Sequence, residues 1–378
     1  MKYLQLFIFI LINSLFVAKY GSRIFSEYLF FVAAYILLVI AFFFLIEKKK
    51  NFIDKIPFKA VYFTLLTLGV LGSLSLLIII DPYALNADRW SAIHYFIEYL
   101  FAGQYPYAAQ THLGGYGSPF PVWQFFHIPF YLLGNTSYAF AFSFALTAGL
   151  ILWLTKSFRQ ASLFLFFLLL SPAFWYEAAI RSDLLYNIVL CLLVIAVIEK
   201  KQITISSNAW MLGIICGLFL STRLITAVPF FIYFFRSFLN TKLKFQVIFV
   251  GTILLVFVLS FLPFLLWDGE MLLFFHYSPF VLQARQGTSI ELIAVGVLIL
   301  FLSFRWKDFS RYCGIVSICL FVLMSVTFLR HILTNGFYFT LFESGFDITY
   351  FSTTLSFVIF ILSGAYVSRE KDDVNSKD

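Results

Sequence analysis

Charged residues are scarce in this chain of 378 residues: they make up only 12% of it, whereas a soluble domain carries about 25%. Hydrophobic residues make up 62% of the chain, and its mean hydropathy is +0.93. A soluble fold could not cover its surface with so few charges. The composition therefore excludes a soluble enzyme, a disordered protein and a nucleic-acid-binding domain.

Cysteine is also rare, and the chain has no C-x-x-C spacing. Its four cysteines all lie inside apolar runs, so we interpret them as small buried residues and not as a disulfide or metal framework. The chain lacks a Walker loop, a G-x-G-x-x-G motif before a helix and a nucleophile elbow. Three histidines, His94, His112 and His127, share no helix face at ligand spacing. We expect no metal site and no cofactor, and the sequence leaves a need for a divalent ion open.

Long apolar runs recur along the whole chain. A helix that spans a bilayer needs roughly 20 mostly apolar residues, and about twelve runs approach this length. They predict an all-α polytopic membrane protein whose single integral membrane domain covers 1–378. The predicted spans lie near 3–18, 27–46, 58–80, 137–155, 160–178, 183–198, 207–221, 223–238, 245–266, 289–305, 312–330 and 349–367. The pair 207–221 and 223–238 is short enough to be one kinked helix.

Basic residues follow the positive-inside rule if the N-terminus is cytoplasmic. Most of the 26 Lys and Arg residues then lie in short cytoplasmic loops or in the cytoplasmic tail 368–378, so topology explains the net charge of +7. The exceptions are Lys19, Arg23, Arg89, Arg181, Arg223, Arg285 and Arg330. We expect both termini to be cytoplasmic and the membrane to be a plasma membrane, with the bilayer as a partner and no nucleic acid.

The longest outer segment is the extracytoplasmic loop 81–136. From Asp88 its pattern predicts an amphipathic surface helix of about fifteen residues that Gly103 ends. A glycine-rich stretch over 114–119 follows. The segment 120–133 carries two prolines and predicts an interfacial or re-entrant helix. Polar chemistry therefore collects in this loop.

The motifs of this loop resemble those of the GT-C superfamily of membrane glycosyltransferases, especially the mannosyltransferase-like families that use polyprenyl-phosphate sugars. The resemblance rests on several short motifs in order, over about 80–290: Asp88-Arg89-Trp90, Gly103-Gln104-Tyr105-Pro106-Tyr107, Ser118-Pro119-Phe120-Pro121, Ser171-Pro172, Ile180-Arg181-Ser182-Asp183, 218–223 and 278–287. Two departures are the two extra spans before the loop and the lack of a paired acid beside Asp88. The lack of a large C-terminal soluble domain excludes the oligosaccharyltransferase branch.

The resemblance implies transfer of a sugar, mannose-like at family level, from a polyprenyl-phosphate donor to a glycan, lipid or protein acceptor at the outer face. An inverting transfer needs a carboxylate base and cations that stabilise the leaving phosphate. Asp88 is the first candidate for the base, although Asp is also a common N-cap residue. Asp183 is expected to assist it or to orient a sugar hydroxyl, although Asp183 and Arg181 could simply form an ion pair. The candidate substrate-binding residues are Asp81, Arg89, Tyr107, Glu177, Arg181, Arg223, His276, Tyr277 and Arg285.

Among these candidates, Arg223 and Arg285 are expected to contact the lipid phosphate, because Arg binds phosphate bidentately. Asp81 is a second candidate for the base or a plain helix-end residue.

Two other functions remain open. A multi-pass transporter or flippase of lipid-linked glycans also fits about twelve spans, but the halves of the chain show no internal repeat and the charges avoid the middle of the spans. An O-antigen ligase or polymerase also carries outward-facing arginines. Proteins of that class place their large loop late in the chain, whereas here it is early.

Overall fold

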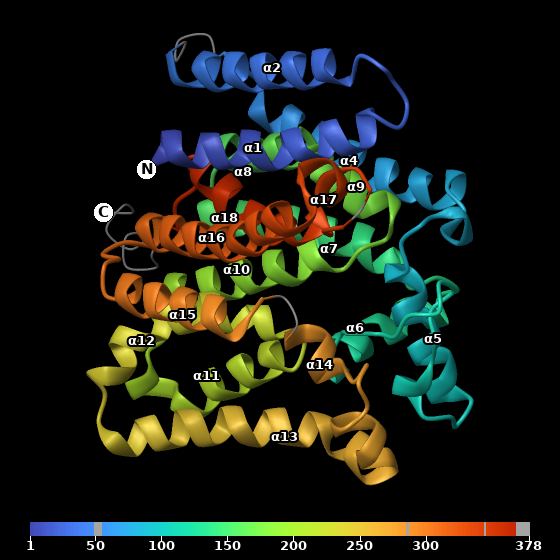
Figure 1. The fold of residues 1–378 in the computed structure, drawn as a ribbon. Helices are drawn as coiled ribbons and strands as arrows, with labels where there is room; N and C mark the ends of the chain where they lie inside the picture. Colours follow the sequence, from blue (N-terminus) through green and yellow to red (C-terminus); the bar gives the residue numbers. More distant parts are fainter. Residues whose placement is uncertain (49–54, 285–286, 344, 368–378) are drawn as a thin grey trace.

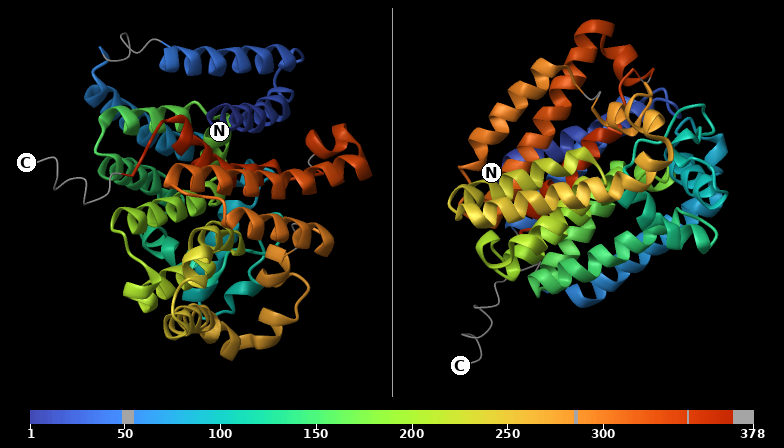
Figure 2. Two further views of the ribbon diagram at one scale, coloured as in Figure 1. Left: turned by 90° about the vertical axis from the view of Figure 1, so that its left-hand side faces the viewer. Right: turned by 90° about the horizontal axis from the view of Figure 1, so that it is seen from below.

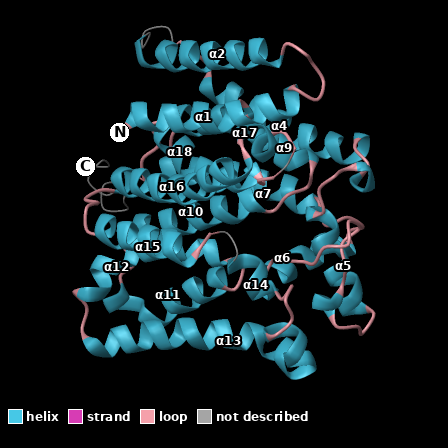
Figure 3. Cartoon of the chain, in the orientation of Figure 1, coloured by secondary structure: helices cyan, strands magenta, loops and turns pink. Residues whose placement is uncertain are grey.

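The computed structural model describes residues 1–48, 55–284, 287–343 and 345–367. These ranges form helices and connecting loops, with no β-strand among them and one isolated bridge between Gln110 and Tyr116 (Figure 3). The prediction of an all-α protein is confirmed. The four cysteines are free and buried, as expected. Arg285 and the predicted tail 368–378 lie outside the described residues.

Six helices of the described chain are long and apolar enough to cross a membrane, or seven if one bent pair counts as a span. The bent pair is α8 (Phe158–Leu169) and α9 (Pro172–Ala179), which meet at 67°. The six helices are α1 (Lys2–Gly21), α2 (Tyr28–Lys48), α4 (Phe58–Ile79), α7 (Tyr138–Thr155), α13 (Leu243–Leu273) and α16 (Phe309–Asn335). Helices of this kind fit a lipid bilayer, while the number of about twelve spans stays a prediction.

Shorter helices complete the bundle. Those that pack within the bundle are α10 (Leu184–Lys200), α11 (Ile205–Leu220), η3 (Leu224–Thr226), α12 (Ala227–Leu239), α15 (Ser289–Ser303), η4 (Ile348–Phe351) and α18 (Ser352–Leu362). The others lie in connections: η1 (Pro82–Ala84), α5 (Arg89–Phe101), η2 (Pro106–Ala108), α6 (Pro121–Leu132), α14 (Pro279–Ala284) and α17 (Phe337–Leu341). The predicted spans 207–221 and 223–238 are separate helices, α11 and η3–α12.

The bundle has a buried centre and apolar edges. Every residue of α18 is buried, and this helix contacts α1, α8, α10 and α16. In contrast, α2 and α13 lie at opposite edges of the bundle in both Figure 1 and the left view of Figure 2, and their apolar side chains are largely exposed. Exposed apolar faces of this extent are what lipid would cover.

The long connection between α4 and α7 lies at one end of the bundle, to the right in Figure 1, and Met1 lies at the other end. We call the first end the loop end. The connection holds α5 and α6 where the sequence predicts surface helices. Gly103, at φ +68°, follows α5, and the left-handed conformation that glycine adopts readily ends the helix there.

Candidate functional site

A large polar cavity opens at the loop end of the bundle. Its volume is about 880 Å³, which lies within the range of small-molecule sites. Segments from five parts of the chain line it: 19–20, 86–89, 113–118, 176–180 and, from the second half of the chain, residues between 277 and 350. The cavity therefore exists only when the connection between α4 and α7 meets the ends of α1, α9 and α16.

Asp88 lies on the wall of this cavity at the start of α5. It occupies the N-cap position, but its side chain makes no capping hydrogen bond. Helix capping therefore does not explain the position of the carboxylate. Its Oδ2 instead accepts a hydrogen bond of 3.0 Å from Thr111 Oγ1. Asp88 forms no ion pair among the described residues. A carboxylate with one hydroxyl partner keeps lone pairs free for a ligand.

Gly115 explains how the loop approaches Asp88 so closely. A Cβ atom at this position would lie 2.9 Å from Asp88 Oδ2 and 3.3 Å from Thr111 Oγ1. The Gly115 backbone N–H also donates to Thr111 Oγ1 at 3.0 Å. The glycine-rich stretch thus places Thr111, and through it the carboxylate, at a distance that a side chain at 115 would not allow.

Arg89, the next residue, turns toward a different partner. Its Nη2 forms an ion pair with Asp347 Oδ2 and lies 3.3 Å from Thr349 Oγ1, and its guanidinium lies 5.5 Å from the Tyr350 ring. Burial acts to raise the pKa of the Asp347 carboxyl, but the charge of Arg89 and the hydrogen bonds from Thr349 outweigh it and hold that pKa below its usual range. Arg89 lines the cavity as a cation that is already paired.

Asp183 and Arg223 form a buried ion pair beside the cavity. Arg223 Nε donates to Asp183 Oδ2 at 2.8 Å, and Arg223 Nη2 bonds the same oxygen. Each of the two residues is only 4% exposed. The alternative prediction of an ion pair between Asp183 and Arg181 is wrong, because Asp183 pairs with Arg223. Arg223 is the cation that neutralises Asp183.

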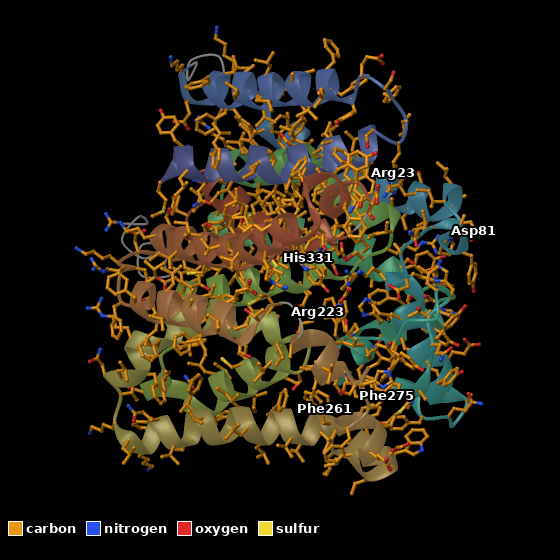
Figure 4. All side chains as sticks on the ribbon, viewed as in Figure 1. Arg23, Asp81, Arg223, Phe261, Phe275 and His331 are labelled. Atoms are coloured by element: carbon orange, nitrogen blue, oxygen red, sulfur yellow. The ribbon has the colours of Figure 1, made fainter. Side chains whose placement is uncertain are left out.

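A second, apolar pocket of about 280 Å³ has Arg223 in its wall. It shares Ser118, Leu282 and Tyr350 with the polar cavity, so the two spaces are neighbours. Arg223 Nη1 lies 3.5 Å from Ser118 Oγ at this shared wall. The rest of the lining is mostly apolar and comes from η3, α10, α12, α14, α15, α16 and α18, with Gln283 and Thr353 as polar members. Figure 4 shows Arg223 inside the bundle, whereas Asp81 lies at its edge.

Several predicted site residues have structural partners elsewhere. Asp81 is exposed and its side chain caps η1 through the Tyr83 N–H at 3.0 Å. Arg181 Nη2 donates to the carbonyls of Leu77 and Ile80, at the end of α4. Neither Asp81 nor Arg181 lines the polar cavity or the apolar pocket.

Two more predicted residues are buried away from the cavity. Tyr107 is 4% exposed within an aromatic cluster, and its hydroxyl donates to the Pro119 carbonyl at 3.3 Å. Glu177 is fully buried, and accepts hydrogen bonds from Ser352 Oγ at 2.8 Å and from the Leu185 N–H at 3.3 Å. These contacts give both side chains a role in holding elements together.

The connection between α13 and α14 contributes one predicted residue to the cavity. Tyr277 lines it and stacks on Tyr116, with ring centroids 5.4 Å apart. His276 instead lines a smaller pocket with Asp268 and Glu270. Within the described ranges, no group of three or more His, Cys, Asp or Glu residues is arranged to hold a metal ion.

Sequence reasoning missed two charged residues of the cavity, Lys19 and Asp347. Each carried a weak signal. Lys19 is the lone lysine among the basic residues predicted to lie outside, and Asp347 is an acid in a late loop that is also predicted to lie outside. Neither residue lies in a sequence motif that predicts what it contacts.

Comparison with known proteins does not assign the chain to a family. No family model matches the chain, and no curated protein or solved structure matches it significantly. The case for a function therefore rests on the geometry of the site and on the motifs of the sequence.

Proposed function

We propose that the protein is a glycosyltransferase that moves a sugar from a polyprenyl-phosphate donor to an acceptor at the extracytoplasmic face. One observation carries the proposal: a polar cavity with an unpaired carboxylate, Asp88, shares a wall with an apolar pocket that contains an arginine, Arg223. A donor with a sugar, a phosphate and a long hydrocarbon chain needs a polar space, a cation and an apolar space in this order. The loop end would then be the extracytoplasmic side of the membrane.

In this proposal Asp88 is the general base. It takes the proton from an acceptor hydroxyl while that oxygen forms a bond to the anomeric carbon of the donor sugar. The bond from the anomeric carbon to the phosphate oxygen breaks on the opposite face, which inverts the configuration. The polyprenyl phosphate leaves with the electron pair of that bond. The lone pairs that Thr111 leaves free on Asp88 suit this role.

Arg223 is the proposed contact for the leaving phosphate. Two of its five N–H groups bond Asp183 and a third faces Ser118 at a long 3.5 Å. The other N–H groups remain for phosphate oxygens at the wall between the two pockets. Asp183 acts as a positioning residue in this account, because it fixes the guanidinium and does not line the polar cavity.

The test is transfer by purified protein. We expect a radiolabelled sugar to pass from a polyprenyl-phosphate donor, with mannose tried first, to a glycan, lipid or protein acceptor, while the same sugar on a nucleotide is not used. A panel of lipid-linked donors that yields no product, together with movement of the intact lipid-linked sugar across proteoliposomes, would contradict the proposal and favour a transporter.

A further inference from the structure

Lys19 is a buried cation in the wall of the polar cavity. It lies at the end of α1, is only 3% exposed, and lines the cavity. Its Nζ donates one hydrogen bond of 3.3 Å, to the backbone carbonyl of Phe346. An ammonium group has three donors, and no carboxylate of the described residues lies within ion-pair distance of this one. A buried cation without a carboxylate partner is costly.

Asp347, an acidic residue of the same wall, already has its own ion-pair and hydrogen-bond partners. Asp347 accepts from Arg89, from Thr349 Oγ1 at 2.6 Å and from the Thr349 N–H at 3.0 Å. Asp347 and Arg89 cancel each other's charge, so this wall keeps one positive charge in excess, on Lys19. Asp88, another carboxylate of the cavity lining, keeps its charge but lies in the connection between α4 and α7, where it accepts a hydrogen bond from Thr111.

His331 is a second polar group of the cavity lining, and it shares Phe346 as a neighbour with Lys19. It lines the cavity from α16, and its ring lies 5.6 Å from the ring of Phe346, the residue whose carbonyl Lys19 contacts. Tyr20 and Tyr176 form a stacked pair in the wall beside Lys19, with ring centroids 4.1 Å apart. Aromatic rings and a cation around a polar space of this size suit a sugar that carries a negative charge.

We propose that Lys19 and His331 form an oxyanion subsite that holds a carboxylate or phosphate group of a saccharide in the polar cavity. The subsite is separate from Arg223, which lines the apolar pocket. That the saccharide is the acceptor rests on the proposed function. The protein would then prefer acidic glycans, such as those with uronic acids or sugar phosphates, over neutral ones.

The experiment measures binding to the full chain in detergent by saturation-transfer NMR, with no donor present. The probes are glucuronic acid, glucose 6-phosphate, glucose and inorganic phosphate. We expect both acidic sugars to bind about tenfold more tightly than glucose, the effect of one charge-assisted hydrogen bond. Glucose 6-phosphate should also bind more tightly than inorganic phosphate. Equal binding of acidic and neutral sugars would overturn the proposal, and equal binding of the two phosphates would remove its saccharide part.

Variants locate the subsite. Lys19→Gln can keep the bond to the Phe346 carbonyl and should lose the preference for acidic sugars, while Lys19→Arg should keep most of it. Arg23→Gln is the matched control, because Arg23 lies four residues further on, is exposed and does not line the cavity. A preference that survives in Lys19→Gln, or disappears in Arg23→Gln, overturns the assignment. If Lys19→Gln does not fold, His331→Asn provides the same comparison.

Transfer assays separate this inference from the proposed function. Acidic sugars that bind through Lys19 in a protein without transferase activity would contradict only the proposed function. Transfer to acidic and neutral acceptors at equal kcat/KM, unchanged by Lys19→Gln, would contradict only the subsite.

Discussion

The guanidinium of Arg223 donates two hydrogen bonds to one carboxylate oxygen of Asp183, 40 residues earlier in the chain. Asp183 precedes α10 and Arg223 precedes η3, so the pair joins two helix starts at the loop end. It also fixes Arg223, which lines the apolar pocket. The pair thus links the stability of this end of the bundle to the position of a proposed phosphate contact.

Removing one member of this pair should be severely destabilising. Asp183→Ala or Arg223→Ala leaves an uncompensated buried charge, and we expect a loss of about 3–5 kcal/mol in the free energy of unfolding. The double variant Asp183→Leu/Arg223→Met removes both charges and should lose much less. Denaturant unfolding in detergent measures all three. Additive losses in the double variant would show that the two side chains do not interact.

Acid should weaken the fold. Burial acts to raise the pKa of Asp183, but the positive charges of Arg223 and Arg89 outweigh it and hold that pKa below its ordinary value of 3.8. The unfolded chain therefore binds a proton at higher pH than the folded chain does. Stability from this group is complete above about pH 4 and falls as the pH drops below it. Thermal unfolding of Asp183→Leu/Arg223→Met should show a shallower acid limb than the natural sequence, and equal slopes would contradict this account.

Gly115→Ala should impair the proposed base without unfolding the protein. The new Cβ would lie 2.9 Å from Asp88 Oδ2, so the carboxylate must move. We expect kcat to fall roughly tenfold to a hundredfold, as small misplacements of catalytic groups cause. Gly149→Ala in α7 is the control, because its Cβ meets nothing within 4 Å. Transfer at the natural rate by Gly115→Ala would show that the position of Asp88 does not matter.

Arg181 should act through the end of α4. It donates to the carbonyls of Leu77 at 3.0 Å and Ile80 at 2.9 Å, which have no partner within the helix. Arg181→Gln should lower the free energy of unfolding by about 1–3 kcal/mol. Arg181 has φ +58°, and Gln pays the same backbone cost, so the loss reports the side chain. Arg23→Gln, at an exposed arginine, should have little effect, and an equally stable Arg181→Gln would contradict the role.

Local patterns in the sequence were enough to predict that α5 and α6 are helices. The amphipathic run after Asp88 and the stop at Gly103 predict α5, and the two prolines and apolar run predict α6. Both signals lie within a few turns of chain, where spacing determines which face is apolar.

The sequence did not predict which side chains pair across the bundle. Arg181 and Asp183 are close in sequence, yet Asp183 pairs with Arg223. Arg89 pairs with Asp347 across 258 residues, and Lys19 reaches Phe346 across 327. Such pairs depend on which helix ends meet at the loop end, and an apolar stretch carries little information about its neighbours. For the same reason the sequence predicted polar site residues in the connection between α4 and α7 but not the contribution of α1 and α16 to the cavity.

The most direct test compares sugar transfer by Asp88→Asn with transfer by Glu98→Gln. Asp88 lines the polar cavity, whereas Glu98 is exposed near the other end of α5 and lies outside it. Both changes remove one carboxylate charge from the same helix. We predict that Asp88→Asn lowers kcat at least about a hundredfold, as expected for loss of a general base, while Glu98→Gln transfers sugar at the natural rate. Natural activity in Asp88→Asn would contradict the account.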